Sequence, residues 1–391
     1  MKKTVQAVLN RVGLTALISV SLISGTVQAA SNEARLKSAV DQQAKLLMNE
    51  YDIPGMAFGV IIDGDTRFYS YGLADKQANK PVSENTIFEI GSISKTFAAT
   101  LASYSELKGT LNLEESTKKY IPYLNNSAIG NTKLINLATY SAGGLPLQVP
   151  AEVQNNKELL RYYKSWQPSY PVNSKRLYSN ASIGLFGYVS ALSLGADYTQ
   201  VMEESILPSL NLSNTFINVP KEKMKNYAFG YNANNDAIRV NPGILDAEAY
   251  GIKSTITDMT HFMAANMGVM PLDENIQQAL ENTRKGYYQA SSFTQGLGWE
   301  MYPFPTQLET LIEGNSNEVI LEPQAMTIAN HPTAVLDNVW VNKTGSTNGF
   351  GGYIAYIPAK KSGVVILANK KYPNADRVKA AYHILQSSMA D

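Results

Sequence analysis

Residues 55–71 read GMAFGVIIDGDTRFYSY, a β-rich run from Gly55 to Ile62 that turns at Asp63-Gly64-Asp65 and returns from Thr66 to Tyr71. Asp-Gly between two such runs is typical of a β-hairpin. The segment before it, residues 34–50, carries Leu36, Val40, Leu46 and Leu47 at roughly helical spacing. We therefore expect a helix followed by a hairpin near the beginning of the chain.

The other end of the chain shows the same elements in the opposite order. Strands are predicted at Val339 to Lys343, Tyr353 to Ile357 and Gly363 to Leu367, with a turn-rich segment from Ser346 to Gly352 after the first. Pro373-Asn374 opens a final predicted helix. Three strands from one end and two from the other predict one antiparallel sheet that joins the chain ends, with the terminal helices packed on it.

The middle of the chain is mostly helical. Helical periodicity occurs in segments near 92–107, 156–165, 181–193, 198–206 and 257–266, which Gly, Pro and Asn separate. We therefore predict an α+β fold. Residues 30–108 and 236–391 would form a sheet domain, residues 109–235 a mostly helical domain, and the functional site would lie at their junction.

Residues 1–29 resemble an export signal. Lys2, Lys3 and Arg11 supply a basic start, residues 12–23 are apolar and uncharged, and Val27-Gln28-Ala29 offers the small residues that a signal peptidase reads. A retained membrane anchor is the alternative, but the apolar run is short for a membrane span. We expect cleavage after Ala29 and export to the periplasm of a Gram-negative cell.

Composition excludes several classes of function. Without the signal, 30 basic residues face 33 acidic ones, a charge of about −3 that does not suit nucleic acid. The absence of cysteine excludes thiol catalysis and iron–sulfur clusters, and three scattered histidines in no ligand motif indicate no metal site. No second apolar run of 18 residues exists, so we expect a mature chain outside the membrane, monomeric and without a cofactor.

Serine is the candidate nucleophile, and the candidate bases are histidine and lysine. His261 and His383 fall in predicted helices, His331 precedes a proline, and no G-x-S-x-G motif accompanies them. Ser-x-x-Lys, which places both side chains on one helix face, occurs as Ser92/Lys95, Ser105/Lys108 and Ser116/Lys119. Lys108 lies where it would stabilise a helix C-terminus, and Lys119 belongs to a charged run typical of an exposed face.

Ser92 has the context of a nucleophile. It follows the apolar run Ile87-Phe88-Glu89-Ile90 and Gly91 and precedes good buried-helix residues, so it falls at a helix N-terminus, where free backbone N–H groups can stabilise an oxyanion. A plain N-cap explains the motif equally well. Lys95 as a base must be partly neutral, which burial and a second nearby positive charge would favour.

Two further motifs suit such a site. Lys343-Thr344-Gly345 occurs once, at a strand end, and offers a cation, a hydroxyl and a glycine that lets substrate approach the backbone; a solvated strand end is the alternative. Tyr178-Ser179-Asn180 precedes a predicted helix, although the same Tyr-x-Asn pattern recurs at Tyr123 and Tyr372.

In this order, Ser92-Ile93-Ser94-Lys95, Tyr178-Ser179-Asn180 and Lys343-Thr344-Gly345 resemble the motifs of penicillin-recognising serine enzymes, and the tyrosine resembles class C β-lactamases. The resemblance covers essentially the whole mature chain. It includes residues 51–56 (YDIPGM), 143–148 (GGLPLQ), 245–251 (LDAEAYG) and 296–300 (GLGWE).

The resemblance implies hydrolysis of the β-lactam amide bond of cephalosporins and penicillins through an acyl-enzyme on Ser92, with no cofactor. Lys95 and Tyr178 would share the proton transfers, which leaves open the principal base, and Lys343 would lower the pKa of the phenol. The N–H groups of Ser92 and Ser346 would form the oxyanion hole. The implied substrate-binding residues are Gln148, Asn180 and Tyr250 at the acylamide side chain, and Thr344, Gly345, Ser346, Asn374 and Arg377 at the carboxylate end.

Three other activities use the same fold and motifs: a D-Ala-D-Ala carboxypeptidase, an esterase, and a covalent β-lactam sensor. The sensor normally has a transmembrane relay, and the esterases often lack Lys-Thr-Gly. The sequence also departs from the common class C pattern. Asn342 stands where a histidine is frequent and Lys371 where an asparagine is frequent, which bears on carboxylate recognition.

Overall fold

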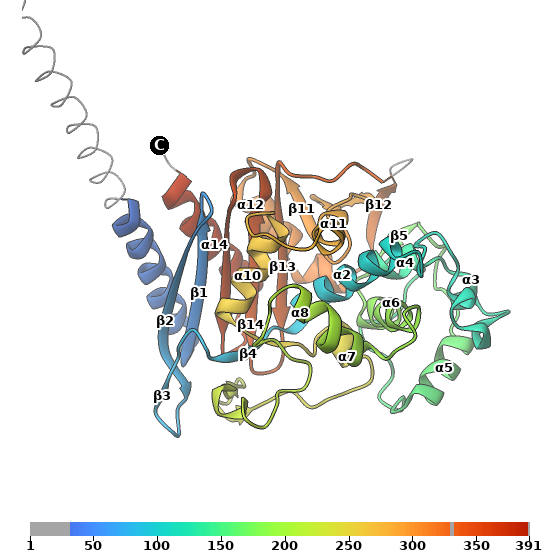
Figure 1. The fold of residues 1–391 in the computed structure, drawn as a ribbon, viewed down its shortest axis with the longest axis horizontal. Helices are drawn as coiled ribbons and strands as arrows, with labels where there is room; N and C mark the ends of the chain where they lie inside the picture. Colours follow the sequence, from blue (N-terminus) through green and yellow to red (C-terminus); the bar gives the residue numbers. More distant parts are fainter. Residues whose placement is uncertain (1–31, 329–331, 390–391) are drawn as a thin grey trace, which may run out of the picture.

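The structure, a computed structural model, describes residues 32–328 and 332–389, and its centre is an antiparallel sheet of eleven strands (Figure 1). The strand order is β3-β2-β1-β15-β14-β13-β11-β10-β9-β12-β5. Their bounds in this order are Lys80–Pro81, Asp65–Asp75, Gly55–Ile62, Ser362–Ala368, Gly351–Ile357, Val339–Ser346, Glu300–Pro303, Phe293–Gln295, Tyr288–Ala290, Gln324–Ile328 and Lys175–Arg176. Since β1 pairs with β15, both chain ends share one sheet, as predicted.

Strand β1 shows why this sheet forms the centre of the fold. Its side chains alternate between two apolar layers: Met56, Phe58 and Val60 pack on one face, and Ala57 and Ile61 on the other. The first layer lies under the N-terminal helix (residues 32–51) and α14 (Asn374–Met389), which lie side by side in Figure 1. The two predicted terminal helices are thereby confirmed.

The second layer lies under α10 (Ile256–Asn266), which approaches the sheet closely. A Cβ on Gly59 of β1 would lie 1.9 Å from Thr260 Oγ1 of this helix. Glycine at this position therefore allows the helix to pack directly on the strand.

A mostly helical region, cyan and green in Figure 1, packs around α2 (Ser94–Leu107) beside the sheet and has an apolar cluster of its own. Its helices are α3 (Ala128–Asn131), α4 (Leu134–Ala138), α5 (Asn156–Ser165), α6 (Asn180–Leu192), α7 (Tyr198–Val201), a π-helical turn (Met202–Ile206) and α8 (Leu207–Ser209). The remaining helices are α9 (Asp246–Ala249), α11 (Glu274–Asn282), α12 (Leu308–Gly314) and α13 (Asn317–Leu321). Two small sheets pair β4 (Ile87–Glu89) with β8 (Lys253–Thr255) and β6 (Gly230–Tyr231) with β7 (Ala237–Ile238).

The structure differs from the sequence-based predictions in several places. The strand predicted to end at Lys343 continues to Ser346, so the turn spans only residues 347–350. The segment predicted as one helix at 198–206 is α-helical only from Tyr198 to Val201 and continues as a π-helical turn from Met202 to Ile206. β5, which lies inside the segment predicted as helical, pairs with β12 of the sheet. The predicted signal at 1–29 lies outside the described residues, and the domain boundaries stay a prediction.

Candidate active site

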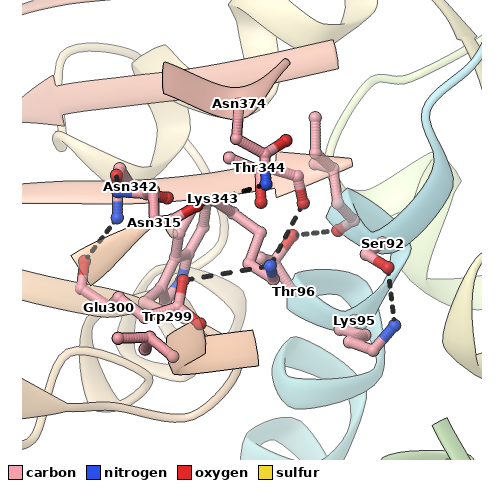
Figure 2. A network of polar contacts seen from close by, with 12 residues as sticks. Ser92, Lys95, Thr96, Trp299, Glu300, Asn315, Asn342, Lys343, Thr344 and Asn374 are labelled. Atoms are coloured by element: carbon pink, nitrogen blue, oxygen red, sulfur yellow. Dashed lines mark hydrogen bonds and ion pairs between the residues drawn. The ribbon is translucent and has the colours of Figure 1, made fainter. Parts of the chain in front are cut away.

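Ser92 lies in a single 3₁₀ turn, Gly91–Ile93, that leads directly into α2. Lys95 follows one helical turn later on the same face, and its Nζ donates to Ser92 Oγ at 2.9 Å and to the carbonyl of Ala249 at 2.6 Å (Figure 2). The Lys95 side chain is fully buried. The site therefore contains a serine hydroxyl held against an amine that water does not reach.

Burial changes the protonation of that amine. It lowers the pKa of Lys95 to about 8, and the positive charge of Lys343 lowers the pKa in the same direction, while the Tyr178 phenol opposes the shift. A lysine with such a pKa is partly neutral near neutral pH, which a general base requires.

Tyr178 stands between two lysines. It directly precedes Ser179, the N-cap of α6, and its buried ring lies 5.0 Å from Lys95 Nζ and 5.1 Å from Lys343 Nζ, measured to the ring centroid. Burial alone would raise the pKa of the phenol. The charges of Lys343 and Lys95, followed by hydrogen bonds with Ser92 and Lys95, lower the pKa of Tyr178 below its ordinary value.

Lys343 is not a solvated residue at a strand end. It lies within β13 and is only 3% exposed. Its Nζ donates to the carbonyl of Thr344 at 3.1 Å and lies 3.9 Å from Glu300 Oε2. The alternative interpretation of the Lys-Thr-Gly motif, a solvated strand end, is therefore wrong, because this lysine is buried and lies close to the phenol ring of Tyr178.

The end of β13 meets the 3₁₀ turn of Ser92 backbone to backbone. A Cβ on Gly91, which has φ +53°, would lie 2.4 Å from the Ser346 nitrogen, and a Cβ on Gly345 would lie 2.0 Å from the Ile90 carbonyl oxygen. This close approach puts the backbone of Ser346 beside that of Ser92, as an oxyanion hole requires. Gly345 is needed for contact with the protein's own backbone, whereas we expected it to admit substrate.

Arg377 lies elsewhere than expected. It is fully buried, and its guanidinium donates to the carbonyls of Gly345, Gly352 and Tyr372 and to Ser346 Oγ at 2.9 Å. Its two terminal nitrogens donate inside the protein, and its Nε is buried without a hydrogen-bond partner among the described residues, so the guanidinium does not face a carboxylate directly. Arg377 instead holds the end of β13 and the Ser346 hydroxyl in place, while Asn374 at the start of α14 stays partly exposed.

The residues expected at the acylamide side chain lie together. The Asn180 N–H donates to the carbonyl of Leu147 at 2.9 Å, which fixes Asn180 beside the neighbour of Gln148. Asn180 Oδ1 is buried without a hydrogen-bond partner among the described residues. Gln148 and Tyr250 line a pocket of about 520 Å³, and the rest of its lining is Val149, Pro150, Ala151, Val153, Gln154, Pro242, Gly243 and Ile244. A buried amide oxygen without a partner, bonded through its own backbone to the residue before Gln148, is suited to accept an N–H of a substrate.

The other serine and histidine candidates lie in unsuitable surroundings. Ser105 Oγ is buried and donates to its own helix, and Lys119 pairs with Glu115 on an exposed surface. His261 and His383 are exposed on α10 and α14, and His331 lies outside the described residues. Within residues 32–328 and 332–389, no three His, Cys, Asp or Glu side chains are grouped so that they could hold a metal ion.

Sequence reasoning missed a buried charge cluster behind Tyr178. The Arg176 guanidinium lies 5.7 Å from the Tyr178 ring centroid, donates to Gln295 at 2.9 Å and pairs with Glu300 at 3.3 Å. Glu300 in turn approaches Lys343. No motif marks these residues, because Arg176 meets Gln295 and Glu300 across more than 100 residues of sequence.

The two departures from the class C pattern lie outside the reacting groups. Asn342 is buried, accepts hydrogen bonds from Asn315 and Tyr353, and donates to the Glu300 carbonyl, as Figure 2 shows for Asn315 and Glu300. It alternates with Lys343 along β13 and so lies on the opposite face. Lys371 is exposed.

This geometry defines a class of enzyme. A serine, two lysines and a phenol of lowered pKa meet where an antiparallel sheet contacts a helical region, which is the arrangement of a serine hydrolase with a lysine–tyrosine base.

Comparison with known proteins identifies the family. The model of the Beta-lactamase family matches residues 39–388. A β-lactamase of Psychrobacter immobilis is 67% identical over 376 residues, which are 96% of this chain and 94% of that protein. The chain therefore belongs to the β-lactamase family.

Solved structures place it in class C. A class C β-lactamase in complex with cefoxitin shares 44% identity and a TM-score of 0.89, covering 91% of this chain and 99% of that one. A β-lactamase/D-alanine carboxypeptidase from Pseudomonas syringae shares 45% identity, the same TM-score and the same coverage. The predicted family, the predicted fold and the predicted serine hydrolase activity are confirmed.

Proposed function

We propose that this protein hydrolyses β-lactams through an ester on Ser92. Ser92 Oγ attacks the lactam carbonyl while its proton passes to Lys95 or Tyr178, and the developing negative charge is stabilised by the N–H groups of Ser92 and Ser346. The same proton then reaches the lactam nitrogen as the carbon–nitrogen bond breaks. The lysine–tyrosine pair then removes a proton from the water molecule that attacks the ester and returns a proton to Ser92 Oγ as the ester bond breaks.

The position of Tyr178 is the observation that supports this proposal most strongly. Its phenol lies between two buried lysines, beside the serine, and its pKa is lowered despite burial. A group that titrates nearer neutral pH can accept and return a proton in both half-reactions.

The substrate is placed by the residues around the nucleophile. We propose that Gln148, Asn180 and Tyr250 bind the acylamide side chain, and that Thr344, Ser346 and Asn374 bind the carboxylate, with Arg377 supporting Ser346 from behind. Gly345 contributes by allowing the close packing of β13. No metal ion or cofactor enters this mechanism.

The site of action follows from the first residues. We propose that the chain is exported to the periplasm, loses residues 1–29 after Ala29 and acts as a monomer on β-lactams. None of the helices within the described residues is long and apolar enough to cross a membrane.

A D-Ala-D-Ala peptidase is the second candidate, because the similar protein from Pseudomonas syringae is named as both a β-lactamase and a D-alanine carboxypeptidase. Purified mature protein should be compared on a chromogenic cephalosporin and on a peptide that ends in D-Ala-D-Ala. We expect rapid cephalosporin hydrolysis that Ser92→Ala abolishes. Release of D-alanine that is faster than cephalosporin hydrolysis would favour the peptidase.

A further inference from the structure

Glu89, three residues before the nucleophile, is a buried carboxylate that no motif marks. It ends β4, is 2% exposed and accepts three hydrogen bonds from three different segments of the chain. Oε1 accepts from the Tyr227 hydroxyl and the Val240 N–H, both at 2.7 Å, and Oε2 accepts from Thr347 Oγ1 at 2.5 Å.

A buried polar side chain in this place has a cost that its hydrogen bonds must offset. Burying an ionised group is unfavourable unless hydrogen bonds compensate, and an apolar side chain would fill the same space more cheaply. The Tyr227 side of Glu89 is fixed independently, since the Arg239 guanidinium stacks 4.1 Å from the Tyr227 ring centroid and donates to the carbonyls of Tyr227 and Ala228. Glu89 is thus anchored on one side and holds Thr347 on the other.

Thr347 directly follows Ser346, whose N–H is the second donor of the proposed oxyanion hole. Strand β13 has ended at this point, and the turn is closed by a hydrogen bond from the Thr347 N–H to the Phe350 carbonyl. On the other side, Glu89 is joined to Ser92 by only Ile90 and Gly91. The bond from Thr347 to Glu89 therefore links the two backbone segments that carry the two oxyanion donors.

We propose that Glu89 is a positioning residue for the oxyanion hole: by holding the Thr347 hydroxyl it fixes the Ser346 N–H relative to the Ser92 N–H. Oxyanion donors act only when they are aimed at the place where charge develops. Loosening one donor should slow the chemical steps while leaving the binding of substrate nearly unchanged. The inference rests on the proposed acyl-enzyme function.

The test compares two variants that each remove one donor to the same carboxylate. Thr347→Val removes the hydrogen bond to Glu89 Oε2 from the residue that follows Ser346. Tyr227→Phe removes the hydrogen bond to Glu89 Oε1 from the residue that Arg239 holds in place. We expect Thr347→Val to lower the acylation rate constant for cefoxitin about tenfold, less than the roughly 10²- to 10³-fold lost with an entire donor. The apparent dissociation constant of cefoxitin from the Thr347→Val variant should differ from the wild-type value by less than about twofold. Tyr227→Phe should acylate at the wild-type rate.

Infrared spectroscopy of the trapped cefoxitin acyl-enzyme measures the stretching frequency of the ester carbonyl. A change in the stability of the fold alone would not change this frequency. Weaker hydrogen bonds to the ester carbonyl raise its stretching frequency, so Thr347→Val should show a higher frequency than the wild type and Tyr227→Phe should not. Thr347→Ser retains the hydroxyl and should restore both rate and frequency. Glu89→Gln should behave like the wild type, because its amide can donate to Thr347 while its oxygen still accepts from Tyr227 and Val240.

An unchanged rate and frequency in Thr347→Val would overturn the inference, as would equal losses in Thr347→Val and Tyr227→Phe. The failure of the wild-type protein to form any cefoxitin ester at Ser92 would instead overturn the proposed function. The two failures are therefore distinguishable.

Discussion

Two positive charges act on one phenol, and this explains how a lysine and a tyrosine can replace histidine. Lys95 touches Ser92 directly, whereas Lys343 comes from the sheet and lies 5.1 Å from the centroid of the Tyr178 ring. Each lysine lowers the pKa of the phenol, and Lys343 also lowers that of Lys95. The proton can then be shared among groups of similar acidity rather than held by one strong base.

Replacing Tyr178 by phenylalanine tests this sharing. The ring and its packing remain, so Tyr178→Phe should bind substrate but slow both acylation and deacylation by about 10²- to 10⁴-fold, the usual contribution of general acid–base catalysis. Stopped-flow measurement of both phases provides the check. Loss of acylation with normal deacylation would show that Tyr178 does not activate water.

Lys95 also predicts how stability depends on pH. Its folded pKa of about 8 lies below the unfolded value near 10.4, so between these values the unfolded chain binds more protons and stability rises with pH. From pH 8 to 9.5, the free energy of unfolding of the wild type should gain about 1.6 kcal/mol relative to Lys95→Met. The loss of the Lys95 charge raises the pKa of Tyr178 and acts in the same direction.

Urea denaturation of both proteins at pH 7, 8 and 9.5 measures this difference. The difference should rise by only about 0.4 kcal/mol between pH 7 and 8 and grow more steeply above pH 8. Parallel stability curves over the whole range would mean that Lys95 has an ordinary pKa in the folded protein.

The sequence predicts the residues that lie in motifs and misses those that act through tertiary contacts. Ser92, Lys95, Tyr178 and Lys343 meet as the motif order indicates. The burial of Arg377 could not be foreseen, because it depends on carbonyls at the far end of β13. In general, a backbone carbonyl that accepts from a catalytic lysine, as that of Ala249 does, carries no signature in the sequence.

At the scale of elements, the site depends on the contact between the 3₁₀ turn of Ser92 and the end of β13. Gly91 at φ +53° leaves no room for a side chain beside Ser346, whereas Gly109 at φ +74°, just after α2, has open space around it. A substitution at either glycine strains the backbone, but only a substitution at Gly91 also displaces Ser346 at the end of β13. Comparing the two therefore separates the two effects.

Gly91→Ala should lose at least about 10²-fold in kcat because it pushes the Ser346 N–H away. Gly109→Ala should keep full activity and lose about 1 kcal/mol of stability through its strained backbone. Kinetics and urea denaturation of both variants measure these effects. Full activity in folded Gly91→Ala would contradict the close contact between turn and strand.

Elements with a strong pattern are predicted well, and short ones are not. The helix predicted at 156–165 and the strand at 55–62 have these bounds in the structure. The short strands β9, β10, β11 and β5 escaped prediction, since two to four residues show no periodicity and pair only because their neighbours in the sheet exist.

At the scale of the whole molecule, both ends of the chain build the sheet and the long middle segment builds most of the opposite side of the site. We propose that residues 30–108 and 236–391 act as one domain and 109–235 as another, although β5 already extends the second into the sheet of the first. Ser92 and Lys343 then belong to the first domain and Tyr178 to the second.

Export can be measured directly. Expressed in a Gram-negative host, the periplasmic protein should begin at Ala30, which N-terminal sequencing and intact mass would show. A product that begins at Met1 and remains with the membrane fraction would mean that the apolar run at 12–23 is an anchor.

The most direct test of the mechanism is the mass of the protein after brief exposure to a slowly hydrolysed β-lactam. One equivalent should be added, and the labelled peptide should contain Ser92. The Ser92→Ala variant, folded as the wild type is, should take up no label. A label on Ser105 or Ser116, or hydrolysis without any covalent adduct in a protein whose activity requires added zinc, would contradict the account of Ser92 as the nucleophile.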